Sequence, residues 1–243
     1  IKFLTPRDER AEILCGMAVD VAITHPFNRE VANITARDFM QRLKSRLGLV
    51  RLILGYDSAL GKDREGTVPR LTEIGAELGY AVETVSALSD ESGVISSTEI
   101  RKLVTVGKIE EAAKLMSRPY RLQGVVIRGD QRGRTIGFPT ANLDYSDDKL
   151  ISSNGIYACW AKLGNERFKA AVNIGFNPTF TPDKKTMSVE AYLLDFDRDI
   201  YDENLQLEFV ARLRDELKFE SVEMLVEQIL EDVKQTRILL RTA

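Results

Sequence analysis

The chain has 243 residues and a formal net charge of -3, a length sufficient for one large or two modest domains. The slightly acidic balance argues against a general nucleic-acid-binding protein, because phosphate recognition needs an excess of positive charge. No apolar run approaches the ~20 residues that span a bilayer, and no signal peptide is visible, so we expect no membrane partner.

The cysteines and the first residue add two expectations. Cys15 and Cys159 are the only cysteines and lie far apart in the sequence. They argue against a disulfide framework or a cysteine metal site and favour a cytoplasmic location. The chain begins with Ile1 instead of methionine, so we expect a fragment or a sequence that has lost its N-terminus.

The first half alternates short apolar runs with helical patterns. The runs Val19–Phe27, Leu49–Leu54 and Ala81–Val85 are predicted strands, and Ala36–Leu47 and Val68–Leu78 are predicted helices between them. Strands separated by helices are typical of parallel βαβ units, so the pattern predicts an α/β domain.

Two further helices close this half. Ser96 and Glu99 have the spacing of a capping box and predict a helix start. A second short helix, Ile109–Met116, ends before Pro119, and a proline there continues a helix poorly. We therefore predict a domain boundary between residues 118 and 119, with a first domain over 1–118.

The second half, 119–243, has the period-two pattern of strands without intervening helices. Gly, Pro, Asn and Asp separate these strands, which favours a small antiparallel barrel. Ser221 can cap a last helix that covers the barrel. The predicted strands are Leu122–Arg128, Gly155–Leu163, Phe168–Gly175, Ser188–Asp195 and Leu205–Leu213.

A glycine-rich stretch at 129–142 carries the strongest functional pattern. Glycines let a backbone approach a phosphate closely, and successive amide groups then form an anion-binding concavity. A hydroxyl and an amide placed together suit a hard cation such as Mg²⁺. The stretch has no lysine and is not a Walker loop, and a glycine-rich hairpin with solvated arginines fits the spacing equally well. Its residues of interest are Gly129, Gly133, Arg134, Gly137, Thr140 and Asn142.

The exact strings decide between these readings. The segments 137–142 (Gly-Phe-Pro-Thr-Ala-Asn), 173–179 (Asn-Ile-Gly-Phe-Asn-Pro-Thr), 189–192 (Val-Glu-Ala-Tyr) and 213–219 (Leu-Arg-Asp-Glu-Leu-Lys-Phe) occur in this order. From about Tyr120 to the C-terminal helix the chain resembles the riboflavin kinase domain of bacterial bifunctional riboflavin kinase/FMN adenylyltransferases. The resemblance implies a small antiparallel β-barrel kinase domain with a C-terminal helix.

The same resemblance assigns roles in phosphoryl transfer from ATP. It implies that Glu190 is the catalytic base, whereas the strand pattern alone indicates a solvated glutamate. Thr140 and Asn142 would hold Mg²⁺ and the nucleotide phosphates, although an Asx-type turn is the competing reading of this pair. Three glycines and an arginine would form the phosphate flap, namely Gly129, Gly133, Arg134 and Gly137.

A flavin-closing loop is the third implied element of the kinase. Arg214 and Phe219 match it, and a guanidinium and an aromatic ring can both contact the plane of a flavin. Without the resemblance, these residues indicate an exposed Arg–Glu pair and a core phenylalanine.

The N-terminal region, from Leu4 to about Pro119, resembles the adenylyltransferase module of the same family. That module implies an α/β, nucleotidyltransferase-like (Rossmann-like) fold, N-terminally incomplete here. The helix start at Ser96, Ser97, Thr98 and Arg101 would bind ATP phosphates, whereas a capping box alone indicates only a helix start. The family's His-x-Gly-His motif is not in these residues, since His25 is the only histidine.

The resemblance implies an enzyme that phosphorylates riboflavin to FMN with ATP and Mg²⁺ and, in the intact protein, adenylylates FMN to FAD. The 243-residue segment by itself is expected to make FMN but not FAD. A kinase-only enzyme and a non-catalytic flavin- or nucleotide-binding module are the alternatives. An RNA-binding barrel is disfavoured by the acidic balance, and the oligomeric state is not indicated.

Overall fold

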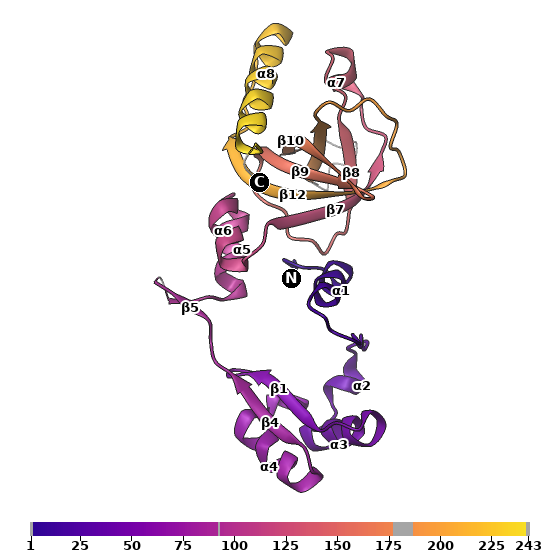
Figure 1. Cartoon of the computed structure of the whole chain (residues 1–243), viewed down its shortest axis with the longest axis vertical. Coiled ribbons are helices and arrows are strands. Elements are labelled where there is room, and N and C mark those ends of the chain that lie inside the picture. Colours follow the sequence, from indigo (N-terminus) through magenta and orange to yellow (C-terminus); the bar gives the residue numbers. More distant parts are fainter. Residues whose placement is uncertain (1, 92, 177–186, 242–243) are drawn as a thin grey trace. The chain divides into compact units, whose positions relative to one another are not determined.

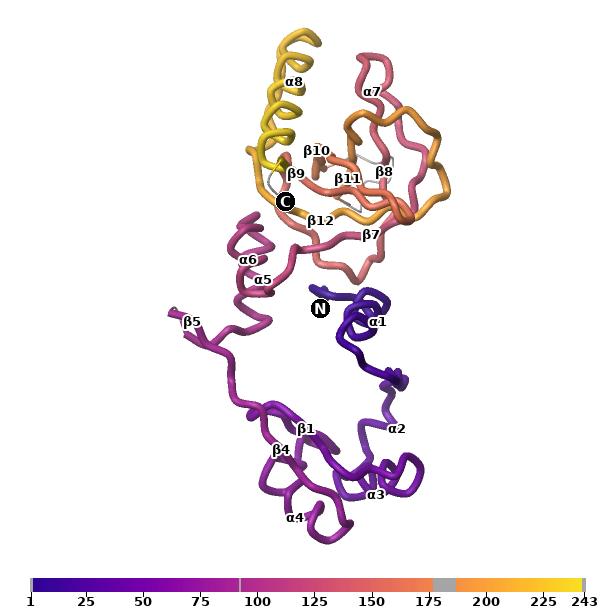
Figure 2. Tube along the Cα trace, viewed as in Figure 1, coloured from indigo at the N-terminus to yellow at the C-terminus, as the bar shows by residue number. Residues whose placement is uncertain are grey.

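The computed structural model describes residues 2–91, 93–176 and 187–241. The chain divides into two compact units, one formed by residues 18–95 and the other by residues 1–17 together with 96–243. Figures 1 and 2 show the elements of each unit. The whole of the predicted barrel domain, residues 119–243, belongs to the second unit.

The 18–95 unit is a small α/β layer. Strands β1 (Arg51–Gly55) and β4 (Ala81–Val85) pair in parallel, as the alternating pattern predicts. Helices α3 (Ala36–Leu47) and α4 (Val68–Leu78) pack on them around a core that includes Met40, Leu71 and Ile74. Each helix ends at a glycine in the left-handed region, the common C-terminal stop. The minor elements are α2 (Arg29–Ala32), β2 (Ala59–Leu60), a 3₁₀ turn (Lys62–Arg64), β3 (Gly66–Thr67), β5 (Ser89–Asp90) and β6 (Gly93–Val94).

One predicted strand is wrong. Val19–Phe27 has no regular secondary structure, and its apolar side chains are open to solvent, with Val21 73% and Phe27 83% exposed. An extended apolar run becomes a strand only when a neighbouring strand takes its backbone hydrogen bonds. Among the described residues, β1 and β4 pair only with each other, so this run has no strand beside it.

The second unit contains a closed six-stranded barrel in the order β10-β11-β8-β7-β12-β9, with all its paired strands antiparallel. Its interior holds the fully buried rings of Tyr120, Tyr157 and Phe209, with Phe209 in ring contact with both tyrosines. The antiparallel barrel predicted from the period-two pattern is confirmed. The strands are β7 (Tyr120–Ile127), β8 (Ala141–Tyr145), β9 (Gly155–Leu163), β10 (Glu166–Phe176), β11 (Met187–Leu193) and β12 (Asn204–Arg214).

Strand β8 has no counterpart among the predicted strands. It is short and contains Asn142 and Asp144, residue types with low strand propensity. It forms because the chain leaving the glycine-rich stretch pairs with β7 on one side and β11 on the other. The stretch itself contains a four-residue helix, α7 (Arg132–Thr135), instead of a simple hairpin.

Three helices of this unit, α5 (Ser97–Thr105), α6 (Ile109–Met116) and α8 (Val222–Leu239), begin where the sequence predicts. The hydroxyl of Ser96 accepts a hydrogen bond from the N–H of Glu99 at the start of α5, and α6 follows. Ser221 caps α8 in the same way, through the N–H of Met224. Helix α8 contacts β9, β10 and β12 and covers the barrel there (Figure 1).

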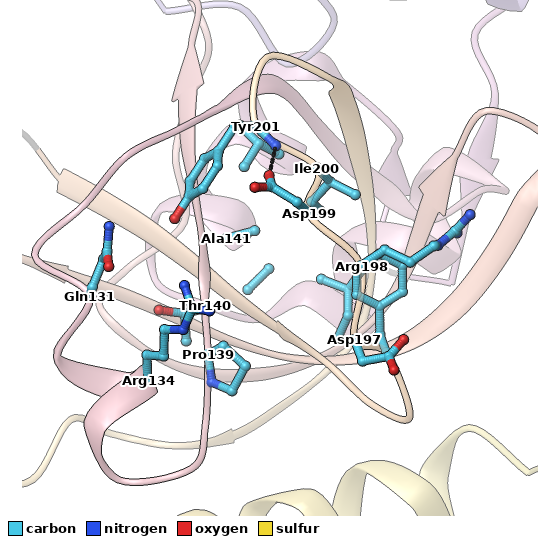
Figure 3. A pocket seen from close by; sticks show the side chains of 14 residues that line it. Gln131, Arg134, Pro139, Thr140, Ala141, Asp197, Arg198, Asp199, Ile200 and Tyr201 are labelled. Atoms are coloured by element: carbon cyan, nitrogen blue, oxygen red, sulfur yellow. Dashed lines mark hydrogen bonds between the residues drawn. The ribbon is translucent and has the colours of Figure 1, made fainter.

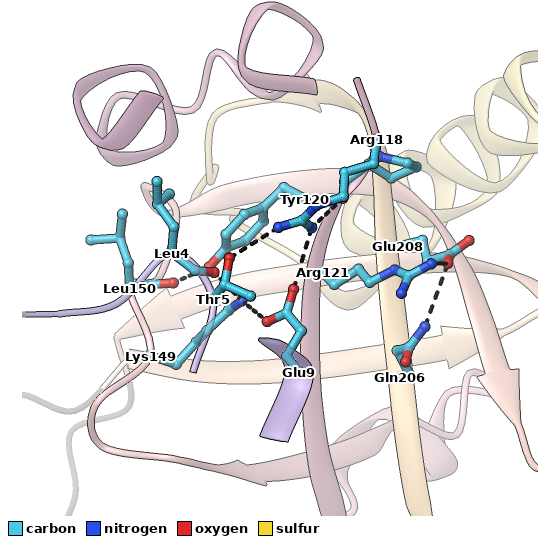
Figure 4. Close-up of polar contacts among 11 residues, drawn as sticks. Leu4, Thr5, Glu9, Arg118, Tyr120, Arg121, Lys149, Leu150, Gln206 and Glu208 are labelled. Atoms are coloured by element: carbon cyan, nitrogen blue, oxygen red, sulfur yellow. Dashed lines mark hydrogen bonds and ion pairs between the residues drawn. The ribbon is translucent and has the colours of Figure 1, made fainter. Parts of the chain in front are cut away.

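The N-terminal segment packs on the barrel. Phe3 forms a parallel bridge with Lys149, and helix α1 (Arg7–Gly16) follows it. Lys149, only 3% exposed, donates from Nζ to Glu9 Oε2 at 2.7 Å and to the carbonyl of Leu4 at 2.7 Å. Figure 4 shows this cluster, in which Arg118 also reaches Glu9. The two compact units are therefore not divided at residues 118/119. The domain boundary at that position remains a prediction.

Candidate active site

Glu190 lies in the middle of a polar row across the barrel wall. In the strand register it stands opposite Asn142 of β8 on one side and Asn173 of β10 on the other. Residues directly opposite in antiparallel strands point to the same face, with Cβ atoms about 4.5–5.5 Å apart. The two amides and the carboxylate thus form one short row of polar groups.

The glutamate is half-buried and has one side-chain partner in the glycine-rich stretch. Thr140 Oγ1 donates a hydrogen bond to Glu190 Oε2 at 3.3 Å. Burial raises the pKa of Glu190 above its ordinary value of 4.5, while the bond from Thr140 acts in the opposite direction. A carboxylate with a raised pKa is a better proton acceptor than a solvated one.

Two cavities share the lining residue Thr140. The smaller, of about 390 Å³, is lined by Arg134, Thr140 and Tyr201 among others, and Figure 3 shows these side chains around it. The larger, of about 650 Å³, holds Glu190 and reaches α8. Thr140 lines both cavities. Glu190 lines only the larger of the two.

The wall of the larger cavity is mostly apolar. Flat aromatic ligands bind preferentially between such walls, with a few polar groups that fix their orientation. Phe219, predicted to contact the flavin, is half-buried in this wall. Its apolar neighbours include Ile156, Val172, Leu217, Val222, Leu225 and Ile229.

The glycines of the stretch make room for its own side chains. A Cβ at Gly129 would collide with the side-chain amide of Asn142, and one at Gly133 would collide with the carbonyl of Phe138. Gly137 has φ +88, in the region that favours glycine. The loop folds back on itself because the N–H of Phe138 donates to the carbonyl of Gly133 at 2.8 Å. The structure thereby brings Thr140 and Asn142 beside Glu190.

Arg214 is held by a residue that sequence reasoning missed. Its Nε and Nη2 donate to the two carboxylate oxygens of Asp232 in α8, at 2.9 and 2.6 Å. The pair is buried, with Asp232 5% and Arg214 18% exposed, and both line the larger cavity. The bidentate bond fixes the plane of the guanidinium. The alternative of an exposed Arg–Glu pair is therefore wrong.

The predicted adenylyltransferase residues lie elsewhere. Ser96, Ser97, Thr98 and Arg101 surround the N-terminus of α5 and line neither cavity. Arg101 Nη1 donates to Ser97 Oγ at 2.9 Å, and Arg101 Nε is buried without a partner among the described residues.

The oxygen atoms around Glu190 suit a hard cation, although they do not come from a cluster of acidic side chains. The described residues contain no group of three or more His, Cys, Asp or Glu side chains that could hold a metal. The oxygen donors available there are instead the hydroxyl of Thr140, the amide of Asn142 and the carboxylate of Glu190. Mg²⁺ needs only one or two protein groups when phosphates and water supply the rest.

Sequence reasoning also missed Asn173 and the Tyr201 side of the smaller cavity. Asn173 was visible only as part of the 173–179 string, and its place opposite Glu190 follows from strand register. The last part of that string, Asn177, Pro178 and Thr179, lies outside the described residues.

Two family models match the chain. The model described as riboflavin kinase matches residues 116–240, and the model described as FAD synthetase matches residues 1–99. Together they define a two-part flavin-nucleotide enzyme, with the barrel and its cavities in the kinase part.

Curated relatives agree over almost the whole chain. It is 37% identical over 237 residues to the bifunctional riboflavin kinase/FMN adenylyltransferase of Listeria monocytogenes, and 31% identical over 234 residues to that of Bacillus subtilis. These alignments cover 98% and 96% of the chain, and 75% and 73% of the relatives. The chain belongs to the family of bifunctional riboflavin kinase/FMN adenylyltransferases.

A solved structure shares the fold. A crystal structure titled as a macrolide-efflux protein from Streptococcus pneumoniae superposes with a TM-score of 0.87 at 32% identity, covering 97% of this chain and 76% of its own. In the part of this chain that the structure describes, no helix is long and apolar enough to cross a membrane.

Proposed function

We propose that this chain transfers the γ-phosphoryl group of ATP to the primary alcohol of riboflavin, giving FMN, and that in the intact protein its N-terminal half serves adenylylation of FMN to FAD. Family membership supports both steps. One geometric observation carries the kinase step: Thr140 lines both cavities and is hydrogen-bonded to the half-buried Glu190.

The two cavities suit the two substrates of the kinase. The larger cavity, with its apolar wall and the clamped guanidinium of Arg214, fits the flat flavin ring. The smaller cavity, with Arg134 beside the glycine-rich stretch, fits the nucleotide. Thr140, which lines both cavities, marks the proposed place where the alcohol and the γ-phosphate meet.

Glu190 is the proposed base. A primary alcohol is a poor nucleophile near neutral pH, so a carboxylate that accepts its proton assists the attack. Thr140 holds the carboxylate, and burial raises its pKa toward the working range. Positioning supplies much of the remaining acceleration in phosphoryl transfer.

Mg²⁺ is the proposed metal, held by Thr140 and Asn142 as the resemblance implies. Hard oxygen donors on three neighbouring side chains support this fit, namely those of Thr140, Asn142 and Glu190. Gly129 leaves space for the Asn142 amide. When bound, the ion would neutralise charge on the phosphate oxygens.

The adenylyl-transfer step rests on the family and on the α5 helix. The first N–H groups of a helix, with the positive end of its dipole, bind phosphate. Ser97, Thr98 and Arg101 are the proposed ATP contacts there, with Ser96 capping the helix. Both substrates are soluble metabolites, and we propose a cytoplasmic enzyme.

The test is incubation of the purified chain with riboflavin, ATP and Mg²⁺, followed by separation of riboflavin, FMN and FAD. FMN formation is expected. Absence of FMN with a folded barrel would contradict the kinase proposal. Supplying FMN instead of riboflavin tests the second step separately, through the amount of FAD formed.

A further inference from the structure

Asn173 lines the larger cavity and has a side-chain oxygen without a partner among the described residues. Asn173 lies in β10 directly opposite Glu190 of β11 and lines the same cavity. Its Oδ1 is buried and accepts no hydrogen bond from any described residue. Within the described part of the chain, the side chain of Glu190 is hydrogen-bonded only to Thr140, so no described bond connects the amide to the glutamate.

Such an atom lowers the stability of the folded state, because it has left water without gaining a partner. Five other buried side-chain atoms of the described residues share this state, but their residues line neither cavity. Among these residues, Asn173 alone lines a cavity that a ligand can enter, and rotation of its amide would turn Oδ1 toward a bound group. A bound molecule with a hydroxyl group would satisfy it.

The position of Asn173 limits which part of the ligand it can reach. Its Cβ stands about 4.5–5.5 Å from that of Glu190 on the same face. If Glu190 accepts the proton of the alcohol that is phosphorylated, the atoms within reach of Asn173 are the neighbouring carbons of the same chain. In riboflavin, these carbons carry further hydroxyl groups.

We propose that the side-chain amide of Asn173 binds a secondary hydroxyl of the polyol chain of the flavin substrate and so orients its terminal hydroxyl toward Glu190. This inference rests on the proposed kinase function. An amide suits the role because it can both accept from and donate to a hydroxyl. Asn173 is thus a substrate-positioning residue that selects ligands with a polyol over ring systems without one.

The experiment replaces Asn173 by leucine, which has a similar shape and no polar atom, in the full 243-residue chain. The matched control is Thr236→Val, because Thr236 Oγ1 is also buried without a partner but lies in α8 away from both cavities. Steady-state FMN formation gives kcat and KM for riboflavin and for ATP. Urea unfolding is followed through Trp160, the only tryptophan and a barrel residue.

Both variants should be at least as stable as the parent, since each removes an unsatisfied polar atom. N173L should lose ~10-fold in kcat/KM for riboflavin, as expected for one hydrogen bond, while KM for ATP stays unchanged. T236V should keep parental kinetics. The inhibition constant of lumiflavin, which has the flavin ring with a methyl group in place of the polyol, should be the same for N173L and the parent.

Three outcomes would overturn the inference. They are parental riboflavin kinetics in N173L, equal weakening of riboflavin and lumiflavin, and a lower unfolding midpoint of N173L, which would indicate a structural role. If N173L does not fold, N173A is carried through the same comparison of riboflavin with lumiflavin. Failure of the parent chain to form any FMN would instead refute the proposed kinase function.

Discussion

Thr140 and Glu190 lie 50 positions apart in the sequence, yet Thr140 Oγ1 donates a hydrogen bond of 3.3 Å to Glu190 Oε2. Strand pairing causes this meeting, because β8 follows Thr140 directly and pairs with β11. Thr140 lines both cavities, and Glu190 lines the larger one. The bond links the glycine-rich stretch to the proposed base, and the predictions below depend on it.

Glu190→Gln should reduce kcat for FMN formation by ~10²–10⁴-fold, the usual contribution of a positioned base. ATP affinity should change little, because the amide keeps the size of the side chain. Glu227→Gln, at an exposed position of α8, is the matched control and should keep parental activity. The kinetics and a binding titration with an unreactive ATP analogue provide the measurement. Parental turnover by E190Q would remove Glu190 from the mechanism.

The acid side of the pH profile should also report Glu190. Because burial raises its pKa, kcat/KM for riboflavin should rise with pH through a midpoint above 4.5. Thr140→Val removes the hydrogen bond that lowers this pKa, so its midpoint should lie higher than that of the parent. A midpoint unchanged or lowered in T140V would contradict the assignment.

The same pKa shift predicts an effect on stability. The folded chain keeps a proton on Glu190 at pH values where the unfolded chain, with a pKa near 4.5, has lost it. The folded state therefore binds more protons in this window, and the free energy of unfolding falls as pH rises through it. E190Q cannot ionise, so its stability relative to the parent should increase from pH 4.5 upward and then level off. Urea unfolding of both proteins at a series of pH values measures the difference.

Gly129→Ala should lower kinase activity by ~10- to 100-fold, because displacement of a catalytic group by about 1 Å has effects of this size. The new Cβ would collide with the Asn142 amide, which has to move. Gly16→Ala is the control, since its Cβ would meet nothing within 4 Å. FMN formation at varied Mg²⁺ measures the effect. An unchanged Mg²⁺ dependence in G129A would argue against Asn142 as a metal ligand.

Asp232→Asn should raise KM for riboflavin more than KM for ATP, because it loosens the guanidinium of Arg214 in the larger cavity. It should also destabilise the barrel by up to about 3–5 kcal/mol, since Arg214 becomes a buried charge without its partner. Asp195→Asn is the matched control. It breaks the exposed ion pair with Arg237 of α8, the helix that also carries Asp232, and should change neither KM. Equal increases in both KM values would indicate general loosening of α8.

Glu9→Gln should destabilise the barrel unit, because Lys149 would keep a buried charge with no opposite charge beside it. The expected cost is up to about 3–5 kcal/mol in urea unfolding monitored by Trp160 fluorescence. Combining Glu9→Leu with Lys149→Met should recover most of this loss. Asp8→Asn, in the exposed Arg7–Asp8 pair, should have little effect. If E9Q is as stable as D8N, the cluster does not hold the N-terminal segment.

Local signals were sufficient for most of the elements. Helix starts at Ser96 and Ser221 were predicted from capping chemistry within one turn, and β12 from its alternating apolar and polar residues. These signals depend on neighbours in sequence, and so they survive without knowledge of the fold. The prediction for Val19–Phe27 was wrong because a strand needs a partner that no local pattern supplies.

The sequence by itself determined the class of barrel, the helix caps and, through its exact strings, the residues proposed for catalysis. Only the tertiary structure decided which side chains meet: Asn173 opposite Glu190, Asp232 against Arg214, and Thr140 between two cavities. Strand pairing sets the first and the third of these meetings, and packing of helix α8 against β12 sets the second. Both join residues distant along the chain, and a one-residue change of register would turn every side chain of a strand to the other face.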